Sequence, residues 1–377
     1  MKILVINWQD IRNPLGGGAE VHLHQVFARI AAMGHEVTVL CSMFPGASAE
    51  ETIDGLEVVR RGARGVFNFV APGGYRRLRR QRAFDVVVDD MNKIPFLAQR
   101  YAREPVCGIV HHLFGSSVFR EANPATAAYV SGMEWRALKR YRRDAVPFIA
   151  VSPSTMSDMM RRGYPQSLLT LVSLAVDHQR FRVSPGAKHP TPLIGYVGRI
   201  KRYKSIDHIV DALPPVLQSI PNAKLVIVGE GDDRPRLERI VDAKGLRGSV
   251  EFTGFVDEER KVQLLQSMWM LVMPSSKEGW GLTVTEANAC GTPAVVSDVP
   301  GLRDAVVDKE TGMLFPYGDR TALAARIIKL LESAELREAM GKRAERFSQQ
   351  FSWDNAAHQT LDVLERTIGQ FSEHKTA

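Results

Sequence analysis

Two glutamates with glycines between them are candidates for ligand binding. Glu278 and Glu286 flank seven residues, two of them glycines, in a stretch that lies between two apolar, strand-like segments. We expect a helix to begin near Leu282 or Thr283, with its free amides toward the ligand. Carboxylates at such a place suit a sugar or a ribose, which offers O–H donors to each acceptor oxygen. The alternative is a pair of surface glutamates stabilised by the helix dipole.

Basic side chains follow another apolar segment, PLIGYVG at 192–198. Arg199 offers a planar guanidinium fork and Lys204 a point charge, and such a pair suits a diphosphate with its two or so negative charges. Lys201 and Arg202 fit a solvated basic loop better. A solvated loop remains the alternative for Arg199 and Lys204 as well.

Three consecutive glycines and a histidine mark the first half of the chain. Gly16, Gly17 and Gly18 open a helical segment, where backbone N–H groups can approach an anion closely. The pattern is neither GxGxxG nor GxxxxGK[ST], which argues against dinucleotide-binding and P-loop sites and leaves a flexible turn as the alternative. His111 ends another strand-like segment and can donate to a hydroxyl or a phosphate, whereas a structural role is favoured for His112.

The surrounding pattern predicts two α/β domains. Strand-like and helical segments alternate up to about residue 176, stop in the Pro- and Gly-rich stretch 177–192, and then alternate again. We therefore predict two Rossmann-like parallel sheets facing each other across a cleft, with ligands beyond the carboxyl ends of the strands. The predicted domains are an acceptor-side domain over 1–180, a nucleotide-sugar-binding domain over 181–352 and a C-terminal helix over 353–377.

Composition favours a soluble cytoplasmic protein. The 377 residues are 45% hydrophobic, enough for two cores, and no apolar run approaches the ~20 residues of a membrane span. The three cysteines are interpreted as buried thiols. The positive charge is uneven, because residues 1–185 carry 24 Lys and Arg against 16 Asp and Glu, whereas the remainder carries 25 against 26. The first half is therefore expected to meet an anionic partner.

Taken together, these motifs resemble those of glycosyltransferase family 4, whose members are retaining enzymes of the GT-B fold. The resemblance covers nearly the whole chain and is carried by the Glu278-to-Glu286 motif, by Gly198-Arg199 with Lys204, by the triple glycine and by His111. Phe351-Ser352-Trp353 also looks like the segment that, in the family, precedes a last helix crossing back to the first domain.

The resemblance implies a role for each residue. Arg199 and Lys204 would hold the donor diphosphate, Glu286 its ribose, Glu278 the sugar hydroxyls, and His111 would contact the transferred sugar. The implied catalytic residues are His111, Glu278, Arg199 and Lys204, and the implied donor-binding residues are Gly17, Gly18, Arg199, Lys204, Glu278, Gly279, Trp280, Gly281, Leu282, Thr283 and Glu286.

Two features bear on the limits of this assignment. Two Asp-Asp pairs, Asp89-Asp90 and Asp232-Asp233, are interpreted as solvated turn residues, because neither has the Asp-x-Asp pattern of metal-dependent GT-A enzymes. We therefore expect no metal and no cofactor, since Lys and Arg supply the positive charge. At one turn this sequence has Pro300-Gly301, where members of the family often have Gly-Gly. We expect this turn to lie away from the reacting groups.

Two basic, helical segments are candidates for the acceptor side. Residues 75–82 read YRRLRRQR and residues 134–143 read EWRALKRYRR. A basic helix with aromatic neighbours can lie on anionic lipid, although a solvated helix face is the alternative; nucleic acid is disfavoured because no base-reading motif accompanies the charge. The predicted acceptor or membrane face is Arg76, Arg77, Arg79, Arg80, Arg136, Lys139, Arg140 and Arg143.

The leading functional hypothesis is a retaining, metal-independent hexosyltransferase. It would move sugar from a UDP- or GDP-linked donor to a glycan or lipid-linked acceptor, in cell-envelope or lipid-linked glycan synthesis. The protein would be cytoplasmic, with peripheral attachment to the membrane as an option. The alternatives are an epimerase of the same fold that converts its nucleotide sugar without an acceptor, a non-catalytic sugar-nucleotide-binding protein, and a peripheral membrane adaptor that binds in a salt-sensitive way without nucleotide.

Overall fold

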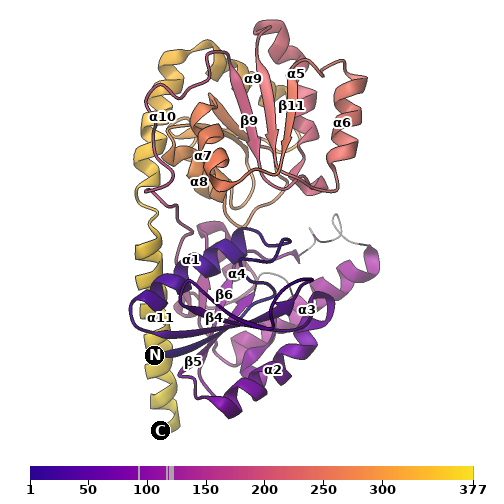
Figure 1. The fold of residues 1–377 in the computed structure, drawn as a ribbon. Helices are drawn as coiled ribbons and strands as arrows, with labels where there is room; N and C mark the ends of the chain where they lie inside the picture. Colours follow the sequence, from indigo (N-terminus) through magenta and orange to yellow (C-terminus); the bar gives the residue numbers. More distant parts are fainter. Residues whose placement is uncertain (92–93, 116–117, 119–122, 377) are drawn as a thin grey trace. The chain divides into compact units, whose positions relative to one another are not determined.

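The computed structural model describes residues 1–91, 94–115, 118 and 123–376. The chain folds into two compact units (Figure 1), of which unit 1 comprises Met1–Leu174 with Trp353–Ala377 and unit 2 comprises Ala175–Ser352. Each unit contains one β-sheet with helices packed against it. The prediction of two α/β domains built on parallel sheets is confirmed.

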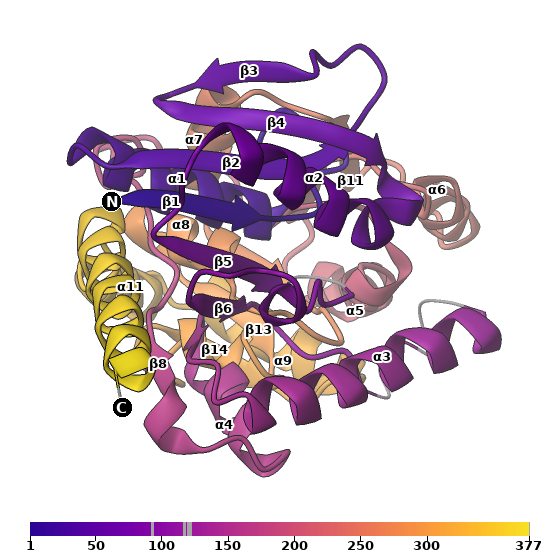
Figure 2. The same cartoon turned by 90° about the horizontal axis from the view of Figure 1, so that it is seen from below.

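Unit 1 is built on an eight-stranded sheet. Its elements are β1 (Lys2–Ile6), α1 (Gly18–Ala32), β2 (Glu36–Met43), β3 (Glu50–Ile53), β4 (Leu56–Ala63), η1 (Arg64–Val66), α2 (Phe67–Gln81), β5 (Val86–Met91), η2 (Ala98–Arg100), β6 (Val106–Val110), α3 (Pro124–Arg143), β7 (Phe148–Ala150), α4 (Pro153–Arg161), η4 (Gln166–Leu168), β8 (Leu169–Leu171) and α11 (Trp353–Thr376). The strand order is β3-β4-β2-β1-β5-β6-β7-β8, and Figure 2 shows the labelled strands stacked in this order. Among the described strands only β3 runs antiparallel to its neighbour.

Burial on both faces explains the apolar strands of this sheet. Residues 3–6 of β1 are completely buried, as expected of a central parallel strand. Figure 1 shows α1 and α2 on opposite sides of the strands. One core cluster joins Leu4 and Ile6 to Phe67 of α2 and Tyr141 of α3, so α2 and α3 cover one face of the sheet. Helix α11 packs on α1, β5 and β6.

Unit 2 is built on a six-stranded, parallel sheet. Its elements are β9 (Leu193–Val197), η5 (Arg202–Lys204), α5 (Asp207–Ser219), β10 (Lys224–Val228), α6 (Arg234–Ala243), β11 (Val250–Gly254), α7 (Glu258–Ser267), β12 (Met270–Met273), α8 (Leu282–Ala289), β13 (Ala294–Ser297), η6 (Arg303–Ala305), β14 (Gly312–Phe315), α9 (Arg320–Glu332) and α10 (Ala334–Ser348). The strand order is β11-β10-β9-β12-β13-β14. The central strands β9 and β12 are neighbours, so the loops that follow them leave the same edge of the sheet.

The final segment of the chain returns to unit 1. Trp353 at the start of α11 lies beside His22, with ring centroids 6.0 Å apart, and Asp354 accepts a 2.6 Å hydrogen bond from Arg29 of α1. The periodicity of residues 320–370 predicts helix, and the structure divides this region into α9, α10 and α11.

The two short edge strands of unit 1 are the part of the fold that the sequence pattern does not reveal. β3 reads EETI and lies at the sheet edge, and β8 has three residues.

The predicted burial of the three cysteine thiols, Cys41, Cys107 and Cys290, is confirmed. No helix in the described part of the chain has both the length and the apolar content that crossing a membrane requires.

Candidate active site

Lys204 and Glu278 come together at the carboxyl edge of the unit 2 sheet. Lys204 ends η5 after β9, and Glu278 lies in the loop between β12 and α8. Their side chains form an ion pair between Nζ and Oε1. The carbonyl oxygen of Tyr203 accepts hydrogen bonds from the N–H and the hydroxyl of Ser276, at 2.9 and 3.0 Å. The two loops are therefore joined by both backbone and side-chain contacts.

The Lys204–Glu278 pair is shielded from water but remains accessible at one side. The side chains are 11% and 13% exposed, respectively. Burial lowers the pKa of Lys204, but the charge of Glu278 and the nearby Tyr203 outweigh it, so the pKa lies above its ordinary value. Lys204 is therefore cationic at neutral pH, and an anionic ligand at this place would meet a positive charge in a medium that screens it weakly.

Arg199 is held at the same edge through its backbone. Its carbonyl oxygen accepts a 3.0 Å hydrogen bond from the hydroxyl of Tyr196, which is completely buried in β9. The Arg199 guanidinium is exposed, lies 3.5 Å from the Tyr203 hydroxyl, and lies near enough to Lys204 to lower its pKa slightly. Unit 2 thus presents two cations and one carboxylate side by side.

Helix α8 begins at Leu282, as predicted, directly after the loop that carries Glu278. The predicted donor-binding residue Trp280 is 7% exposed, and its indole N–H donates to the Thr285 hydroxyl at 3.0 Å. Its ring lies against Phe351 with a centroid distance of 5.1 Å. The Trp280 side chain therefore packs within unit 2, where it braces the loop rather than presenting its ring to solvent.

Gly301 corrects the expectation that the Pro300-Gly301 turn lies away from the predicted site. Gly301 has φ +83, and a Cβ placed there would lie 2.7 Å from the carbonyl carbon of Glu278 and 2.9 Å from that of Gly279. The turn therefore packs directly on the loop that presents the Glu278 carboxylate. Only glycine combines this backbone conformation with this close approach.

Glu286 lies one turn into α8 and is 6% exposed. Its Oε1 is 3.1 Å from Nζ of Lys261, a residue of α7. Burial raises the pKa of Glu286, and Lys261 opposes this effect without cancelling it. Glu286 is thus a buried carboxylate with a cationic neighbour, not a surface residue near a helix dipole.

In unit 1 the glycine-rich turn is an ordered helix start. The Gly17 N–H donates to Oε2 of Glu20 at 2.7 Å, and the Gly16 N–H donates to the Asn13 carbonyl at 2.8 Å. A Cβ on Gly18 would meet no atom within 4 Å. No described residue of unit 1 therefore requires glycine at position 18, whereas the Gly17 amide already donates to a carboxylate.

His111 pairs with Asp90, which corrects the interpretation of Asp89-Asp90 as solvated turn residues. Both aspartates are completely buried in β5. Oδ1 of Asp90 lies 2.9 Å from Nε2 of His111, and the His111 carbonyl accepts from the Thr155 hydroxyl at 2.9 Å. Because β5 and β6 are parallel neighbours, their ends bring Asp90 and His111 together.

His22 lies beside the Asp90–His111 pair. Its ring is completely buried, 5.1 Å from the His111 ring between centroids, and neither of its nitrogens has a hydrogen-bond partner among the described residues. Burial lowers the pKa of His22 well below its ordinary value, and His111 lowers it further. His22 is therefore neutral and adds no charge beside His111.

The second Asp-Asp pair is divided between two environments. Asp232 is exposed and pairs with Lys201 at 2.8 Å, as expected of a solvated residue. Asp233 is 8% exposed and pairs with Arg236 of α6 at 2.6 Å, so for this residue the expectation is wrong. Within the described residues, no three His, Cys, Asp or Glu side chains are grouped so that they could hold a metal ion.

The predicted basic face lies on α2 and α3, which cover the same face of the unit 1 sheet. All eight side chains are exposed except Arg140, which is half-buried. Arg79 pairs with Glu104, and Arg140 with Asp144. Lys139 Nζ lies 3.7 Å from the ring centroid of Trp135, itself 57% exposed. Arg76, Arg77, Arg80 and Arg136 form no ion pair with a described residue.

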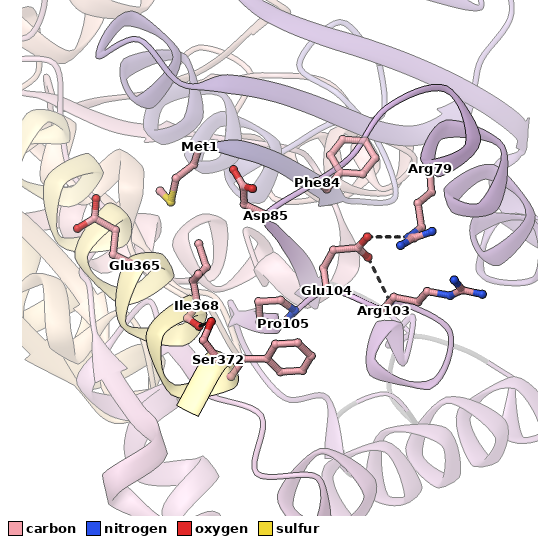
Figure 3. Close-up of a pocket in the computed structure, with 11 residues that line it drawn as sticks. Met1, Arg79, Phe84, Asp85, Arg103, Glu104, Pro105, Glu365, Ile368 and Ser372 are labelled. Atoms are coloured by element: carbon pink, nitrogen blue, oxygen red, sulfur yellow. Dashed lines mark hydrogen bonds and ion pairs between the residues drawn. The ribbon is translucent and has the colours of Figure 1, made fainter. Parts of the chain in front are cut away.

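A pocket of about 550 Å³ lies at the amino-terminal edge of the unit 1 sheet (Figure 3). This edge is opposite to the carboxyl edge, where Asp90 and His111 lie. Within this pocket the Glu104 carboxylate accepts hydrogen bonds from the Arg79 side chain, at 2.8 Å, and from the backbone N–H of Arg103, at 3.1 Å. It includes none of the predicted catalytic residues, so we do not assign it to the active site. Its lining is Met1, Arg79, Phe84, Asp85, Arg103, Glu104, Pro105, Glu365, Ile368, Phe371 and Ser372.

Comparison with known proteins gives matches along most of the chain. The family model described as Glycosyltransferase Family 4 matches residues 16–180, and the model described as Glycosyl transferases group 1 matches residues 177–347. The two matches adjoin close to the boundary between units 1 and 2.

Two curated relatives illustrate the range of similarity. The D-inositol 3-phosphate glycosyltransferase of Jonesia denitrificans is 36% identical over 200 residues, which are 51% of this chain and 47% of that protein. The chain thus spans about half the length of this relative. The phosphatidyl-myo-inositol mannosyltransferase of Mycolicibacterium smegmatis is 26% identical over 371 residues, which are 94% of this chain and 91% of that protein.

Solved structures share the fold over nearly the whole chain. Sucrose-phosphate synthase from Thermosynechococcus elongatus has a TM-score of 0.85 at 22% identity and covers 98% of this chain and 99% of its own. HepE from Anabaena, in complex with UDP and glucose, has a TM-score of 0.78 at 20% identity, covering 97% and 100%. These likenesses concern the fold.

Proposed function

The chain belongs to glycosyltransferase family 4 and has the GT-B fold, and we propose that it moves a hexosyl group from a nucleotide sugar to an acceptor hydroxyl. The observation that carries the proposal is the grouping of Lys204, Glu278 and Arg199 at the carboxyl edge of the unit 2 sheet. Parallel α/β sheets bind ligands at this edge.

Charge explains why this grouping suits the reaction. As the bond between the anomeric carbon and the phosphate oxygen breaks, positive charge builds on the carbon and negative charge on the leaving diphosphate. Lys204 and Arg199 stabilise the diphosphate, and the proton of the acceptor hydroxyl passes to its oxygen. Electrostatic stabilisation of this kind is commonly the largest single contribution to catalysis. Glu278 accepts hydrogen bonds from the sugar hydroxyls, and Glu286 from the ribose.

The proposal includes retention of configuration and no requirement for a metal ion. Lys204 and Arg199 supply the positive charge that a divalent cation supplies in other transferases. A UDP- or GDP-linked donor is proposed; the structure of HepE with UDP and glucose supports the former, and the name of the phosphatidyl-myo-inositol mannosyltransferase supports a hexose as the transferred group. His111, which lies 2.9 Å from Asp90, is the residue to which the family resemblance assigns a contact with the transferred sugar.

A lipid-linked acceptor is proposed on the basis of the α2 and α3 surface. Phe69 and Val66, at the start of α2, are 71% and 48% exposed, and Trp135 of α3 is 57% exposed. Unpaired arginines lie on the same two helices, so apolar and cationic groups are presented together. Such a surface suits the anionic cytoplasmic leaflet of a membrane, which attracts cations and accepts aromatic rings at the headgroup level.

Donor turnover tests the proposed activity. The protein is incubated with UDP- and GDP-hexoses, with and without a lipid-linked glycan extract, and release of nucleoside diphosphate is measured in the presence of EDTA. Release that depends on the extract, together with a glycosylated product of retained anomeric configuration, is expected. Interconversion of the donor without an acceptor would identify an epimerase instead, and no turnover with any donor would contradict the proposal.

Vesicle sedimentation tests the membrane surface separately. Binding to vesicles with anionic phosphatidylglycerol, but not to phosphatidylcholine vesicles, is expected, and replacing Arg76, Arg77 and Arg80 together with Gln should abolish it. The matched control replaces three exposed cations of unit 2, Arg239, Arg247 and Lys342, with Gln. Equal loss in both triple variants would show that net charge, rather than the α2 surface, governs binding.

A further inference from the structure

Lys261 is a buried cation that the predicted site does not include. It lies on α7, and Figure 1 shows α7 beside α8, the helix that carries Glu286. Its Nζ lies 3.1 Å from Oε1 of Glu286 and 3.1 Å from Oε1 of Glu258. Glu286 is buried, whereas the Glu258 side chain is 56% exposed, so the two partners differ in how strongly they depend on Lys261.

The helix that carries Lys261 and the ammonium of Lys261 are both held in place. Asp257 caps the start of α7 by accepting the backbone N–H of Arg260 at 2.7 Å, which defines the first turn of the helix. The ammonium lies 4.9 Å from the ring centroid of Phe181, a residue that is only 5% exposed. A cation held between an aromatic ring and two carboxylates has little freedom to adopt other rotamers.

Burial makes Lys261 and Glu286 depend on each other. Their side chains are 18% and 8% exposed, and a buried charge without a partner is costly. Burial lowers the pKa of Lys261, but Glu286 and Glu258 outweigh it and raise the pKa above its ordinary value. The Lys261 charge in turn opposes the rise that burial causes in the pKa of Glu286.

The pair leaves one acceptor and one donor available. Lys261 contacts Oε1 of Glu286, whereas Oε2 accepts no hydrogen bond from any residue of the described chain. An ammonium carries three N–H donors, of which the two carboxylates occupy two. An accepting oxygen thus lies beside a donating ammonium. A ribose diol offers the complementary pattern, because each of its hydroxyls both donates and accepts.

We propose that Lys261 positions Glu286, to which the proposed function already assigns the ribose of the nucleotide donor, and that Lys261 itself donates a hydrogen bond to that ribose. The inference rests on the proposed function, since it presupposes a nucleotide donor. In this arrangement Oε2 of Glu286 accepts from one ribose hydroxyl, and the ammonium of Lys261 donates to the oxygen of the other. Discrimination between ribonucleotides and deoxyribonucleotides is then a property of the pair, and it is lost when either partner is replaced.

A purely structural role for the ion pair makes a different prediction. If Lys261 only joined α7 to α8, its removal would loosen the whole nucleotide site and weaken ribo- and deoxyribonucleotides alike. The ratio of the two affinities therefore separates the two roles, because a general loosening cancels in the ratio.

The test measures dissociation constants of UDP, 2′-deoxy-UDP, GDP and 2′-deoxy-GDP by isothermal titration calorimetry. Wild type should bind one ribonucleotide about tenfold more tightly than its 2′-deoxy counterpart, as expected for hydrogen bonds to charged groups. In Lys261→Met the ratio should fall to below about threefold, mainly through weaker binding of the ribonucleotide. Glu258→Gln is the matched control, because it removes the exposed partner of Lys261 and leaves the pair with Glu286 intact, so the ratio should persist.

A second variant guards against loss of folding. Lys261→Gln keeps an amide donor near Oε1 of Glu286 without the charge and should give a ratio between those of wild type and Lys261→Met. Circular dichroism and the unfolding midpoint establish that each variant is folded.

The outcomes separate this inference from the proposed function. Equal weakening of both nucleotides in Lys261→Met, or equal binding of both by wild type, would overturn the ribose assignment while leaving a nucleotide-sugar transferase in place. Failure of wild type to bind any of the four nucleotides would contradict the proposed function and this inference with it.

Discussion

The ammonium of Lys204 and the carboxylate of Glu278 form an ion pair that joins the loops after β9 and β12. Neither side chain has more than 13% of its surface exposed. The carboxylate balances the lysine before a donor arrives, and a diphosphate would provide a second anion for the same ammonium. The ammonium of Lys204 is therefore already held where the negative charge of the leaving group would develop. The protein does not have to reorganise around that charge during the reaction.

Replacing Lys204 with Ala should lower kcat by about a hundredfold, the scale expected for loss of one preorganised donor. The loss should appear in kcat as well as in KM, because the charge on the leaving group is greatest in the transition state. Steady-state kinetics with whichever nucleotide sugar the protein turns over measure it. Lys201→Ala serves as the control, because Lys201 is a half-exposed neighbour paired with Asp232. A change of less than about threefold in Lys204→Ala would remove Lys204 from the mechanism.

Gly301→Ala should lower kcat/KM by about tenfold or more, because its Cβ would push the Glu278–Gly279 backbone away from its present position. The control is Gly318→Ala. Gly318 has φ +88, close to the +83 of Gly301, but a Cβ there would meet no atom within 4 Å. Both variants carry the strain of a left-handed alanine, about 1 kcal/mol. Activity that falls equally in both would attribute the loss to strain rather than to the contact with Glu278.

Asp90→Asn should lower kcat by roughly ten- to a hundredfold, since an amide cannot hold the His111 ring in the same orientation as the carboxylate does. The double variant with His111→Ala completes the design. If Asp90 acts through His111, the two losses are not additive. Additive losses would show that Asp90 acts independently of His111.

Asp89 makes the stability of unit 1 depend on pH. Burial raises its pKa to about 6, although hydrogen bonds from the Ala98 amide and the Tyr141 hydroxyl oppose the rise. A carboxyl with a raised pKa stabilises the folded state when protonated, so this stability is present below about pH 4 and is lost as pH rises to about 6. Between pH 5 and pH 7 the free energy of unfolding of wild type, relative to Asp89→Asn, should fall by about 1 kcal/mol. Denaturant unfolding at the two pH values measures it.

The control for this pH effect is Asp232→Asn, at an exposed aspartate. The difference in free energy of unfolding between wild type and this control should stay constant from pH 5 to pH 7. If the free energies of unfolding of wild type and Asp89→Asn also differ by a constant amount over this range, Asp89 is already ionised at pH 5 in the folded protein.

Apolar patterning in the sequence is enough to predict the buried strands. The strand-like segments predicted before Arg199, before Glu278 and before His111 are present as β9, β12 and β6. Helix α8 begins at Leu282 because the strand before it and the glycines of its loop are local signals. The edge strand β3 has no such signal, because EETI is polar and depends on pairing with β4. Contacts between distant segments have no local signal either. Lys261 resembles an ordinary surface lysine in DEERK, and only the packing of α7 on α8 brings it to Glu286.

Asp90 carries a sequence signal that the interpretation as a solvated turn overlooks. It stands at the carboxyl end of an apolar strand, next in sheet order to the strand that ends directly before His111. The rule that ligands gather at such ends applies to it as much as to His111. The role of Gly301 needs the structure, since nothing in Pro300-Gly301 indicates contact with a loop more than twenty residues earlier.

The central claim is that unit 2 binds a nucleotide sugar through Lys204 and Glu286. A thermal-shift panel of UDP, GDP, ADP and their hexose conjugates tests it most directly, with Lys204→Ala, Glu286→Ala and the control Lys201→Ala measured beside wild type. One nucleotide should raise the unfolding midpoint of wild type and of the control by about 5 °C at a hundred times its Kd. The same nucleotide should raise that of the other two variants by much less. Stabilisation that is equal in all four proteins, or absent from all, would contradict the account.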